Sequence, residues 1–299
     1  SAQLVTVTAG ATNDAAQYIA AAFVRRQHAI GDQEAARTDM VRYNLERGLA
    51  FVGAADRFGG GRSVSALADD FAADPGVGDS SVTLGMSVPL TGPNGAYGKE
   101  MKEGALAYFA QLNAAGGING KKVELLALDD GYETDKTVAN TRKLINENKV
   151  FALMAYYGSS PTAEAMKVFS EAKVPLVGTI SGAGSLRTPV NRYMFHLRAS
   201  YADETESIVN HLVGLGITQI AVFYQNDGFG KSGKDGVVAA LAHHKLKPVA
   251  EGSVERNSVQ VESAVTQIAK ANPQAVIMVT LYKPTAEFVR QMRKAGQVP

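Results

Sequence analysis

A pair of serines followed by a proline, Ser159-Ser160-Pro161, has the residue types of an anion-binding helix start. Serine is favoured as the cap of a helix, and proline is favoured in the first turn. A helix that begins there presents backbone N–H groups and the positive end of its dipole, and both attract a carboxylate. Helix capping alone would also explain the two serines. The residues therefore predict either a carboxylate site or an ordinary capped helix.

Two further stretches have the composition of loops that touch a small ligand. Residues 90–98 (LTGPNGAYG) combine small and turn-forming residues with Tyr97, whose ring and hydroxyl could contact a ligand. Residues 178–185 (GTISGAGS) are rich in small residues and contain Ser181 and Gly182. Small residues let the backbone approach a ligand closely. Taken alone, each stretch could equally be an ordinary loop between a strand and a helix.

Residue combinations typical of enzymes and metal sites are weak in this sequence. Asp129 and Asp130 could form a metal or acid–base pair, but neighbouring side chains on an extended chain point in opposite directions, which favours a solvated loop. Residues 157–161 (YGSSP) lack the second glycine of the G-x-S-x-G turn that exposes a nucleophilic serine. Cysteine is absent, which excludes disulfides and thiolate metal sites. We therefore expect no catalytic residue, no metal and no cofactor.

One glycine motif keeps an enzymatic alternative open. Residues 228–233 (GFGKSG) match the G-x-G-x-x-G pattern of dinucleotide-binding loops. The motif lies in the middle of the chain, and Asn226 and Asp227 separate it from the preceding apolar run, which weakens this interpretation. Glu255 follows the motif at a spacing that would suit a contact with ribose. A nucleotide-dependent enzyme therefore stays as the third alternative function.

The composition limits the kinds of partner. The 299 residues carry a formal net charge of +1, so they provide no broad basic field for nucleic acid or an anionic membrane. No apolar run reaches the ~18 residues that a membrane-spanning helix needs. Ser1 is not followed by a basic segment and a long apolar core, so we expect no signal peptide within this sequence.

The chain from residue 82 onward alternates short β-rich runs with amphipathic stretches, which predicts an α/β fold with parallel sheets flanked by helices. The expected strands are 82–88, 122–127, 150–155, 175–178, 219–224, 248–254 and 275–280. The expected helices are 98–114, 136–148, 160–172, 203–215, 230–243, 261–271 and 284–295. Ligands of such sheets bind beyond the carboxyl ends of the strands. The three loops described above should therefore lie together.

The regular alternation breaks once, over residues 187–200. A break between two series of strands and helices predicts two lobes, an N-terminal lobe at residues 81–199 and a partial C-terminal lobe at residues 200–299. Residues 1–80 contain no lysine, and turn-forming residues at 74–81 separate them from the rest of the chain. We expect this leading stretch to be a separate, mainly helical segment of no recognised family that contributes nothing to the pocket.

Several motifs after residue 80 together carry a family resemblance. They are LTGPNGAYG at residues 90–98, NAAGGINGK at 113–121, LDDGY at 128–132, ANTRKLI at 139–145, RASY at 198–201 and YQNDGFG at 224–230. These motifs are similar to those of periplasmic solute-binding proteins of the branched-chain amino-acid (leucine/isoleucine/valine-binding) ABC transporter family. The resemblance covers residues 82–299 and none of residues 1–80.

The resemblance implies a two-lobed type I periplasmic binding protein fold, and a protein that closes on its ligand and catalyses nothing. It implies a monomeric periplasmic, and so extracytoplasmic, receptor that binds an amino acid or similar small carboxylate and delivers it to the permease of an ABC transporter. The ligand-binding residues that it implies are Tyr97, Ser159, Ser160, Ser181, Gly182, Phe229, Leu281 and Tyr282. Gly182 and Phe229 lack the hydroxyl of the threonine and tyrosine that are common at these positions in the family.

The resemblance leaves one alternative and adds one expectation about affinity. A ligand-sensing regulatory domain of the same fold is the alternative function, because a simple transport receptor does not need residues 1–80.

In the family, a glutamate that binds the ligand ammonium comes from a strand after the position of Pro299. We expect this chain to bind an amino acid at least about a hundredfold more weakly than a longer chain, because an unpaired buried charge costs on the order of 3–5 kcal/mol.

Overall fold

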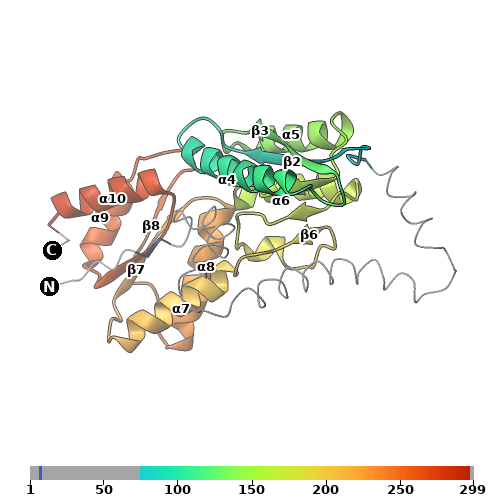
Figure 1. Ribbon diagram of the computed structural model, residues 1–299. Helices are drawn as coiled ribbons and strands as arrows, with labels where there is room; N and C mark the ends of the chain where they lie inside the picture. The colour runs from blue at the N-terminus through green and yellow to red at the C-terminus, as the bar shows by residue number, and fades with distance from the viewer. Residues whose placement is uncertain (1–6, 9–74, 297–299) are drawn as a thin grey trace, which may run out of the picture.

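The computed structural model describes residues 7–8 and 75–296 of the 299-residue chain (Figure 1). The helical segment expected at residues 1–80 therefore lies almost entirely outside the described residues. Two of its residues form the short strand β1 (Val7–Thr8), which pairs in parallel with β9 (Ala275–Val279), far along the chain. None of the helices in the described ranges is both long and apolar enough to cross a membrane.

The first lobe is built on a five-stranded parallel sheet in the order β3-β2-β4-β5-β6. Its elements are β2 (Ser81–Val88), α4 (Gly95–Ala114), β3 (Lys122–Asp129), α5 (Thr134–Asn146), β4 (Ala152–Met154), α6 (Ser159–Glu171), β5 (Leu176–Val177), the 3-10 helix η2 (Gly184–Leu186) and β6 (Met194–Phe195). Helices α5 and α6 pack against each other, and α4 runs in front of the sheet in Figure 1.

The second lobe is built on a four-stranded parallel sheet in the order β1-β9-β7-β8. Its other elements are α7 (Tyr201–Gly214), β7 (Ile220–Gln225), α8 (Gly228–His243), β8 (Glu251–Val254), α9 (Glu262–Ala271) and α10 (Tyr282–Lys294). The chain leaves the first sheet after β6 and enters the second sheet at β7, so the crossover falls where the sequence alternation breaks. The expected α/β fold with two parallel sheets is confirmed.

Every strand and helix expected from the alternation is present, and the boundaries differ by a few residues. Helix α7 begins at Tyr201 rather than at residue 203 because Ser200 and Asp203 form a capping box. In this box Ser200 Oγ accepts the Asp203 N–H at 3.1 Å, and Asp203 Oδ2 accepts the Ser200 N–H at 3.1 Å. Strand β8 begins at Glu251 rather than at residue 248, because Pro248 has no N–H to donate to a ladder.

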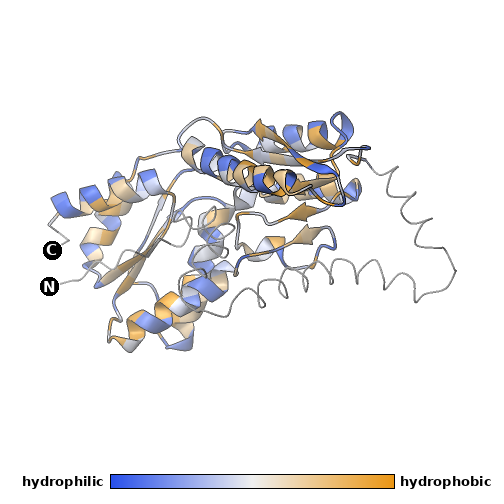
Figure 2. Ribbon diagram, viewed as in Figure 1, coloured by the Kyte–Doolittle hydropathy of each residue, from blue (hydrophilic) through white to orange (hydrophobic). Residues whose placement is uncertain are grey.

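Apolar side chains hold each sheet to its helices, and Figure 2 shows parts of the strands of both sheets in the colours of hydrophobic residues. In the first lobe, Leu144 of α5 and Leu153 of β4 are fully buried. Gly85 of β2 fits between them, since a Cβ there would lie 3.1 Å from each side chain. In the second lobe, Phe223 of β7 stacks on Phe288 of α10 with ring centroids 4.1 Å apart. These cores fix the strands whose carboxyl-end loops form the site.

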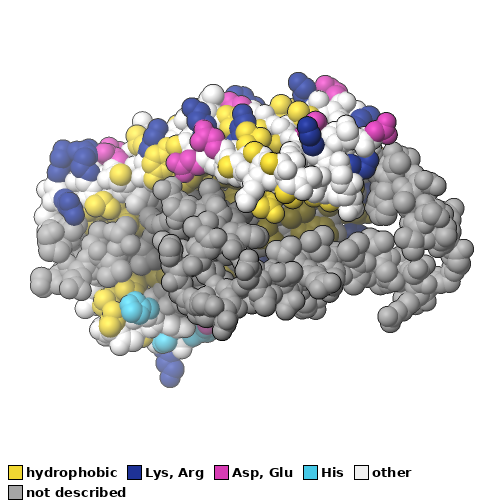
Figure 3. Space-filling view, viewed as in Figure 1, with side chains coloured by type: hydrophobic (Ala, Val, Ile, Leu, Met, Phe, Trp, Pro, Cys, Tyr) yellow, Lys and Arg dark blue, Asp and Glu magenta, His cyan; other side chains and the backbone are white. Residues whose placement is uncertain are grey.

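Charged side chains of both signs lie next to one another over the first lobe (Figure 3). This distribution agrees with the formal net charge of +1 of the whole chain. On the last two strands of the first sheet, Val177 of β5 and its register neighbour Phe195 of the edge strand β6 leave 39% and 49% of their surface exposed. The described helices therefore leave an apolar part of this sheet accessible.

Candidate functional site

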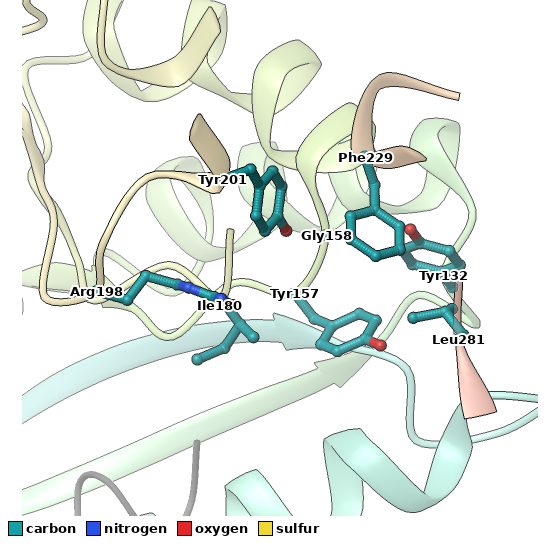
Figure 4. Close-up of a pocket in the computed structure, with 8 residues that line it drawn as sticks. All are labelled: Tyr132, Tyr157, Gly158, Ile180, Arg198, Tyr201, Phe229 and Leu281. Atoms are coloured by element: carbon teal, nitrogen blue, oxygen red, sulfur yellow. The ribbon is translucent and has the colours of Figure 1, made fainter. Parts of the chain in front are cut away.

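A pocket lies between the lobes, where loops at the carboxyl ends of both sheets meet (Figure 4). Its walls are formed by Tyr132, Tyr157, Gly158, Ile180, Arg198, Tyr201, Phe229 and Leu281. The first four follow strands of the first sheet, Arg198 and Tyr201 belong to the crossover and the start of α7, and Phe229 and Leu281 follow strands of the second sheet. The empty volume, which includes space open to solvent, is about 270 Å³.

Aromatic rings from both lobes form most of the pocket wall. Tyr132 and Tyr157 of the first lobe meet edge to face with ring centroids 5.3 Å apart. Tyr201 and Phe229 of the second lobe meet at a tilt with centroids 5.4 Å apart. Behind the wall, Tyr97 stacks on Tyr157 with centroids 5.3 Å apart. Such a wall binds the apolar part of a ligand, while the few polar groups set its orientation.

Two tyrosines of the wall, Tyr132 and Tyr157, have hydroxyls with raised pKa values. Burial raises the pKa of the Tyr132 hydroxyl well above its usual value, and the nearby Asp227 carboxylate adds to the rise. Burial also raises the pKa of the Tyr157 hydroxyl well above its usual value, with Tyr132 as the next cause. The Tyr132 hydroxyl accepts a hydrogen bond from Gln225 Nε2 of β7 at 3.1 Å, which links the two lobes. A neutral phenol can donate to a ligand acceptor without adding a charge to the pocket.

Helix α6 begins at the pocket wall. Its N-cap is Gly158, whose φ is 93°, and a Cβ at this position would lie 2.3 Å from Tyr132 Cε2. No side chain caps α6, so the expectation that Ser159 or Ser160 caps this helix is wrong. Both serines instead occupy the first turn, with the backbone N–H groups that precede the regular helical bonds. The helix start that the sequence suggested as a carboxylate site thus lies beside the pocket.

The predicted site serines make polar contacts next to the pocket. The hydroxyls of Ser159 and Ser181 lie 2.7 Å apart, and both side chains are buried. Ser181 Oγ also accepts the backbone N–H of Ala183 at 3.1 Å. Ser160 Oγ accepts the backbone N–H of Gly228 at 3.0 Å and so joins α6 to α8 of the second lobe. Ser159 therefore belongs to the interior of the first lobe, whereas Ser160 bridges the lobes.

The remaining predicted residues divide between the pocket wall and the layer behind it. Those on the wall are Phe229 and Leu281. Tyr97 and Tyr282 lie behind the wall, edge to face, with ring centroids 5.1 Å apart. Gly182 packs against the crossover and does not reach the pocket surface, since a Cβ there would lie 2.8 Å from the Tyr201 ring. The structure thus gathers all of the predicted residues around one pocket but brings only two of them to its surface.

Sequence reasoning missed six residues of the pocket wall. They are Tyr132, Tyr157, Gly158, Ile180, Arg198 and Tyr201. The first four lie in loops after expected strands, and the last two belong to the RASY motif at residues 198–201. The rule that ligands bind beyond the carboxyl ends of strands could have marked the first four. No local signal shows which side chain of such a loop points inward.

A second set of contacts joins the lobes outside the pocket. Arg256, after β8, donates to Thr134 Oγ1 at 2.9 Å and to Glu133 Oε2 at 3.3 Å. Asn257 Nδ2 donates to Glu133 Oε1 at 2.6 Å, and Asn257 Oδ1 accepts from Asn94 Nδ2 at 2.8 Å. We call Asn94, Glu133, Arg256 and Asn257 the interlobe cluster. Its bonds connect loops at the carboxyl ends of β2 and β3 with the loop after β8, so they stabilise the contact between the lobes.

Asp129 and Asp130 have different surroundings, as expected for neighbours on an extended chain. Asp130 is buried, and it accepts hydrogen bonds from Ser87 Oγ at 2.8 Å and Thr137 Oγ1 at 3.0 Å. Burial raises the pKa of this carboxyl. The expected solvated loop is therefore wrong for Asp130, whereas Asp129 is exposed but ends strand β3 and accepts hydrogen bonds from the loop before α4. Within residues 7–8 and 75–296, no group of three His, Asp or Glu side chains could hold a metal ion.

The glycines of the G-x-G-x-x-G motif are explained by packing at the start of α8. A Cβ on Gly230 would lie 1.9 Å from Gln225 O, and one on Gly233 would lie 2.5 Å from Val279 Cγ1. The Asp227 side chain caps this helix by accepting backbone N–H groups of its first turn. Close approach of the helix to β7 and β9 thus accounts for Gly230 and Gly233 without a nucleotide, and contact with Ser160 Oγ, 2.9 Å from a Cβ on Gly228, accounts for the first glycine.

Comparison with known proteins assigns the family. The family model described as periplasmic binding protein matches residues 81–299. The chain belongs to the periplasmic binding protein family. An amino acid binding protein of Pseudomonas aeruginosa is 28% identical over 220 residues, which cover 73% of this chain and 58% of that protein.

Two solved structures support the same assignment. A substrate-binding periplasmic protein from Ralstonia solanacearum is 36% identical with a TM-score of 0.70, and the match covers 73% of this chain and 62% of that one. A possible leucine/isoleucine/valine-binding protein from Rhodopirellula baltica SH 1 is 34% identical with a TM-score of 0.69, covering 73% of this chain and 60% of that one. This periplasmic binding protein chain thus spans between 58% and 62% of the length of these relatives. The resemblance stated from the motifs is confirmed.

Proposed function

We propose that this chain is the ligand-binding part of an extracytoplasmic receptor that captures an amino acid or similar small carboxylate and delivers it to the permease of an ABC transporter. The observation that carries the proposal is the pocket, in which both lobes supply apolar wall and helix α6 begins at one side. Membership of the periplasmic binding protein family and the similarity to an amino acid binding protein support it.

In this proposal the start of α6 binds the ligand carboxylate. The backbone N–H groups of Ser159 and Ser160 lie in the first turn of α6, where donors without helical partners and the helix dipole favour an anion. The Ser159 hydroxyl, 2.7 Å from that of Ser181, is a further donor on the same side. Phe229 and Leu281 contact the apolar part of the ligand from the other lobe.

Binding is coupled to closure because the pocket wall is divided between the lobes. Tyr132 and Tyr157 belong to the first lobe, and Phe229 and Leu281 belong to the second. A ligand that touches both halves has a higher affinity for the closed form and shifts the population toward it. One chain supplies both halves of the pocket, so the receptor acts as a monomer whose closed form the permease recognises.

A binding screen tests the proposal. Natural amino acids and small monocarboxylates are added to the full chain, and binding is detected by thermal shift and by ligand-observed NMR, which is sensitive to weak ligands. We expect at least one compound of these classes to bind. Leu281→Arg, which places a long cation in the wall, should abolish binding, whereas Leu215→Arg, at a site that is 63% exposed, should not. Circular dichroism confirms that both variants fold. The absence of binding by every compound would contradict the proposal.

A further inference from the structure

Arg198 is the one residue with a charged side chain among the eight that line the pocket. The others are tyrosine, phenylalanine, leucine, isoleucine and glycine. Figure 4 shows Arg198 extending from the crossover toward the side of the pocket where Ile180 lies. The family resemblance did not mark this residue as a ligand contact. A cation within an apolar wall attracts an anion more strongly than it would in water, because the local dielectric is low.

The structure holds Arg198 firmly from its backbone to its guanidinium. Arg187 Nη2 donates to the carbonyl oxygens of Arg198 and Ala199 at 2.7 and 3.1 Å. The Arg198 guanidinium lies 5.3 Å from the centroid of the Tyr201 ring. Its Nη2 donates to Glu204 Oε1, which is the one hydrogen bond that this side chain makes to a described residue. A guanidinium has five N–H donors, so further donors are available to a ligand.

A purely structural role for Arg198 would be to hold the start of α7 through Glu204. That helix start is already stabilised without Arg198, because Ser200 and Asp203 form a complete capping box. The ion pair with Glu204 is also partly exposed, since the two side chains keep 27% and 24% of their surface. The position of Arg198 on the pocket wall therefore needs an explanation beyond the stability of α7.

We propose that Arg198 binds the carboxylate of the ligand, and that the ligand class is a small monocarboxylate with an apolar or aromatic body and no ammonium group, since none of the eight wall residues is acidic. This inference rests on the proposed receptor function and adds a side-chain partner for the acidic group. The aromatic rings of the wall accommodate the apolar body, and the planar guanidinium offers the paired donors that match a carboxylate. The start of α6, on the same pocket, adds its backbone donors.

The test compares an acid with its amide on the full chain. Phenylacetate and phenylacetamide have the same apolar body, and calorimetry or ligand-observed NMR measures both affinities. We expect wild type to prefer phenylacetate over phenylacetamide. Arg198→Met should weaken phenylacetate binding by roughly tenfold to a hundredfold and leave phenylacetamide nearly unchanged, since the lost bonds are charge-assisted. Melting curves show whether the variant folds.

Two control variants separate a ligand contact from a structural role. Arg192→Met removes another arginine that lies over a tyrosine ring, 5.5 Å from the Tyr193 centroid but not on the pocket wall, and should change neither affinity. Glu204→Gln breaks the ion pair and keeps the Arg198 cation, so the preference for phenylacetate should persist. If Glu204→Gln reproduces the loss seen in Arg198→Met, Arg198 acts through α7 and the proposal is overturned.

The remaining outcomes distinguish this inference from the receptor function on which it rests. Equal losses of acid and amide in Arg198→Met would overturn the carboxylate contact. Failure of phenylacetate to bind, while an amino acid from the broader screen does bind, would overturn the ligand class and leave the receptor function standing. Failure of every compound in both experiments would overturn the receptor function and this inference together.

Discussion

Gly158 must be a glycine for two separate reasons, its backbone conformation and its neighbour. Its φ of 93° lies in the region that residues with a side chain rarely adopt. A Cβ would also lie 2.3 Å from Tyr132 Cε2, inside the ring contact that forms the pocket wall. This one residue therefore sets both the start of α6 and the position of Tyr132.

We expect Gly158→Ala to lower the free energy of unfolding by about 2–4 kcal/mol and to weaken ligand binding. The strained backbone costs on the order of 1–3 kcal/mol, and displacing a packed ring adds a similar amount. The matched control is Gly216→Ala, because Gly216 has a φ of 78° and no atom within 4 Å of its added Cβ, so only backbone strain applies. Urea unfolding measures both variants. Equal losses would contradict the role assigned to the Tyr132 contact.

The Asp129 carboxylate stabilises the loop that precedes α4 through hydrogen bonds. Its Oδ1 accepts the backbone N–H groups of Leu90 and Thr91 at 2.7 and 3.1 Å. Partial desolvation raises the pKa of the Asp129 carboxyl, but hydrogen bonds from Thr91 and Leu90 outweigh it, and the pKa is lowered overall. A lowered folded-state pKa means that the charged form stabilises the fold. This stability is present above the ordinary pKa of 3.8 and is lost as the pH falls through the lowered value.

Asp129→Asn should therefore destabilise the chain by about 1 kcal/mol at pH 7, which is the lower end for bonds to a charged group because the site is exposed. The difference from wild type should shrink as the pH falls below 3.8, since the unfolded chain is protonated there, and should vanish once the pH passes the lowered pKa of the folded state. Unfolding curves at pH 7 and pH 3 test this, with Asp79→Asn, an exposed aspartate of the same lobe, as the control. A difference that does not depend on pH would show that the charge is not responsible.

At the scale of elements, the interlobe cluster is the feature that links loops of the two sheets. Arg256→Met removes the bonds to Glu133 and Thr134, which connect the two lobes in this structure. A partly exposed pair of this kind contributes about 0.5–1.5 kcal/mol to the stability of the contact between the lobes. Because ligand binding is coupled to this contact, we expect ligand affinity to fall about twofold to tenfold. Calorimetry with the tightest ligand of the screen measures the change.

The matched control for this variant is Arg290→Met. Arg290 pairs with Glu287 inside α10, and its hydrogen bonds to described residues do not reach the first lobe. Its loss should leave ligand affinity unchanged. If both variants bind as tightly as wild type, the interlobe cluster does not contribute to closure.

The long elements could be predicted from the sequence because apolar periodicity reports which face of each element is buried. The shorter strands were harder to delimit: β5 has two residues where four were expected, since its ladder ends as the chain turns toward the pocket. The start of α7 has a local signal in Ser200 and Asp203. The start of α6 has one in Ser159-Ser160-Pro161, but its N-cap Gly158 does not, because the conformation of Gly158 is tied to the ring of Tyr132 in another loop.

At the scale of the whole molecule, the pocket depends on how the two lobes face each other. The family resemblance identified Phe229 and Leu281, which do lie on the wall, but it did not identify Tyr132 or Arg198. The rule that ligands bind beyond the carboxyl ends of strands identifies the loops that form the pocket. Contacts between the lobes decide which side chain of each loop points into the pocket. The bond from Gln225 Nε2 to the Tyr132 hydroxyl joins residues 93 positions apart, and no local spacing could reveal it.

Closure on a ligand is the central claim, and the distance between one label on each lobe tests it most directly. The chain has no cysteine, so Lys136→Cys on α5 and Gln260→Cys before α9, both exposed, can be spin-labelled without other substitutions. With the tightest ligand of the screen at saturation, we predict that the distribution of label distances becomes narrower and shifts to shorter values. A distribution that is the same with and without the saturating ligand would contradict capture by closure of the two lobes.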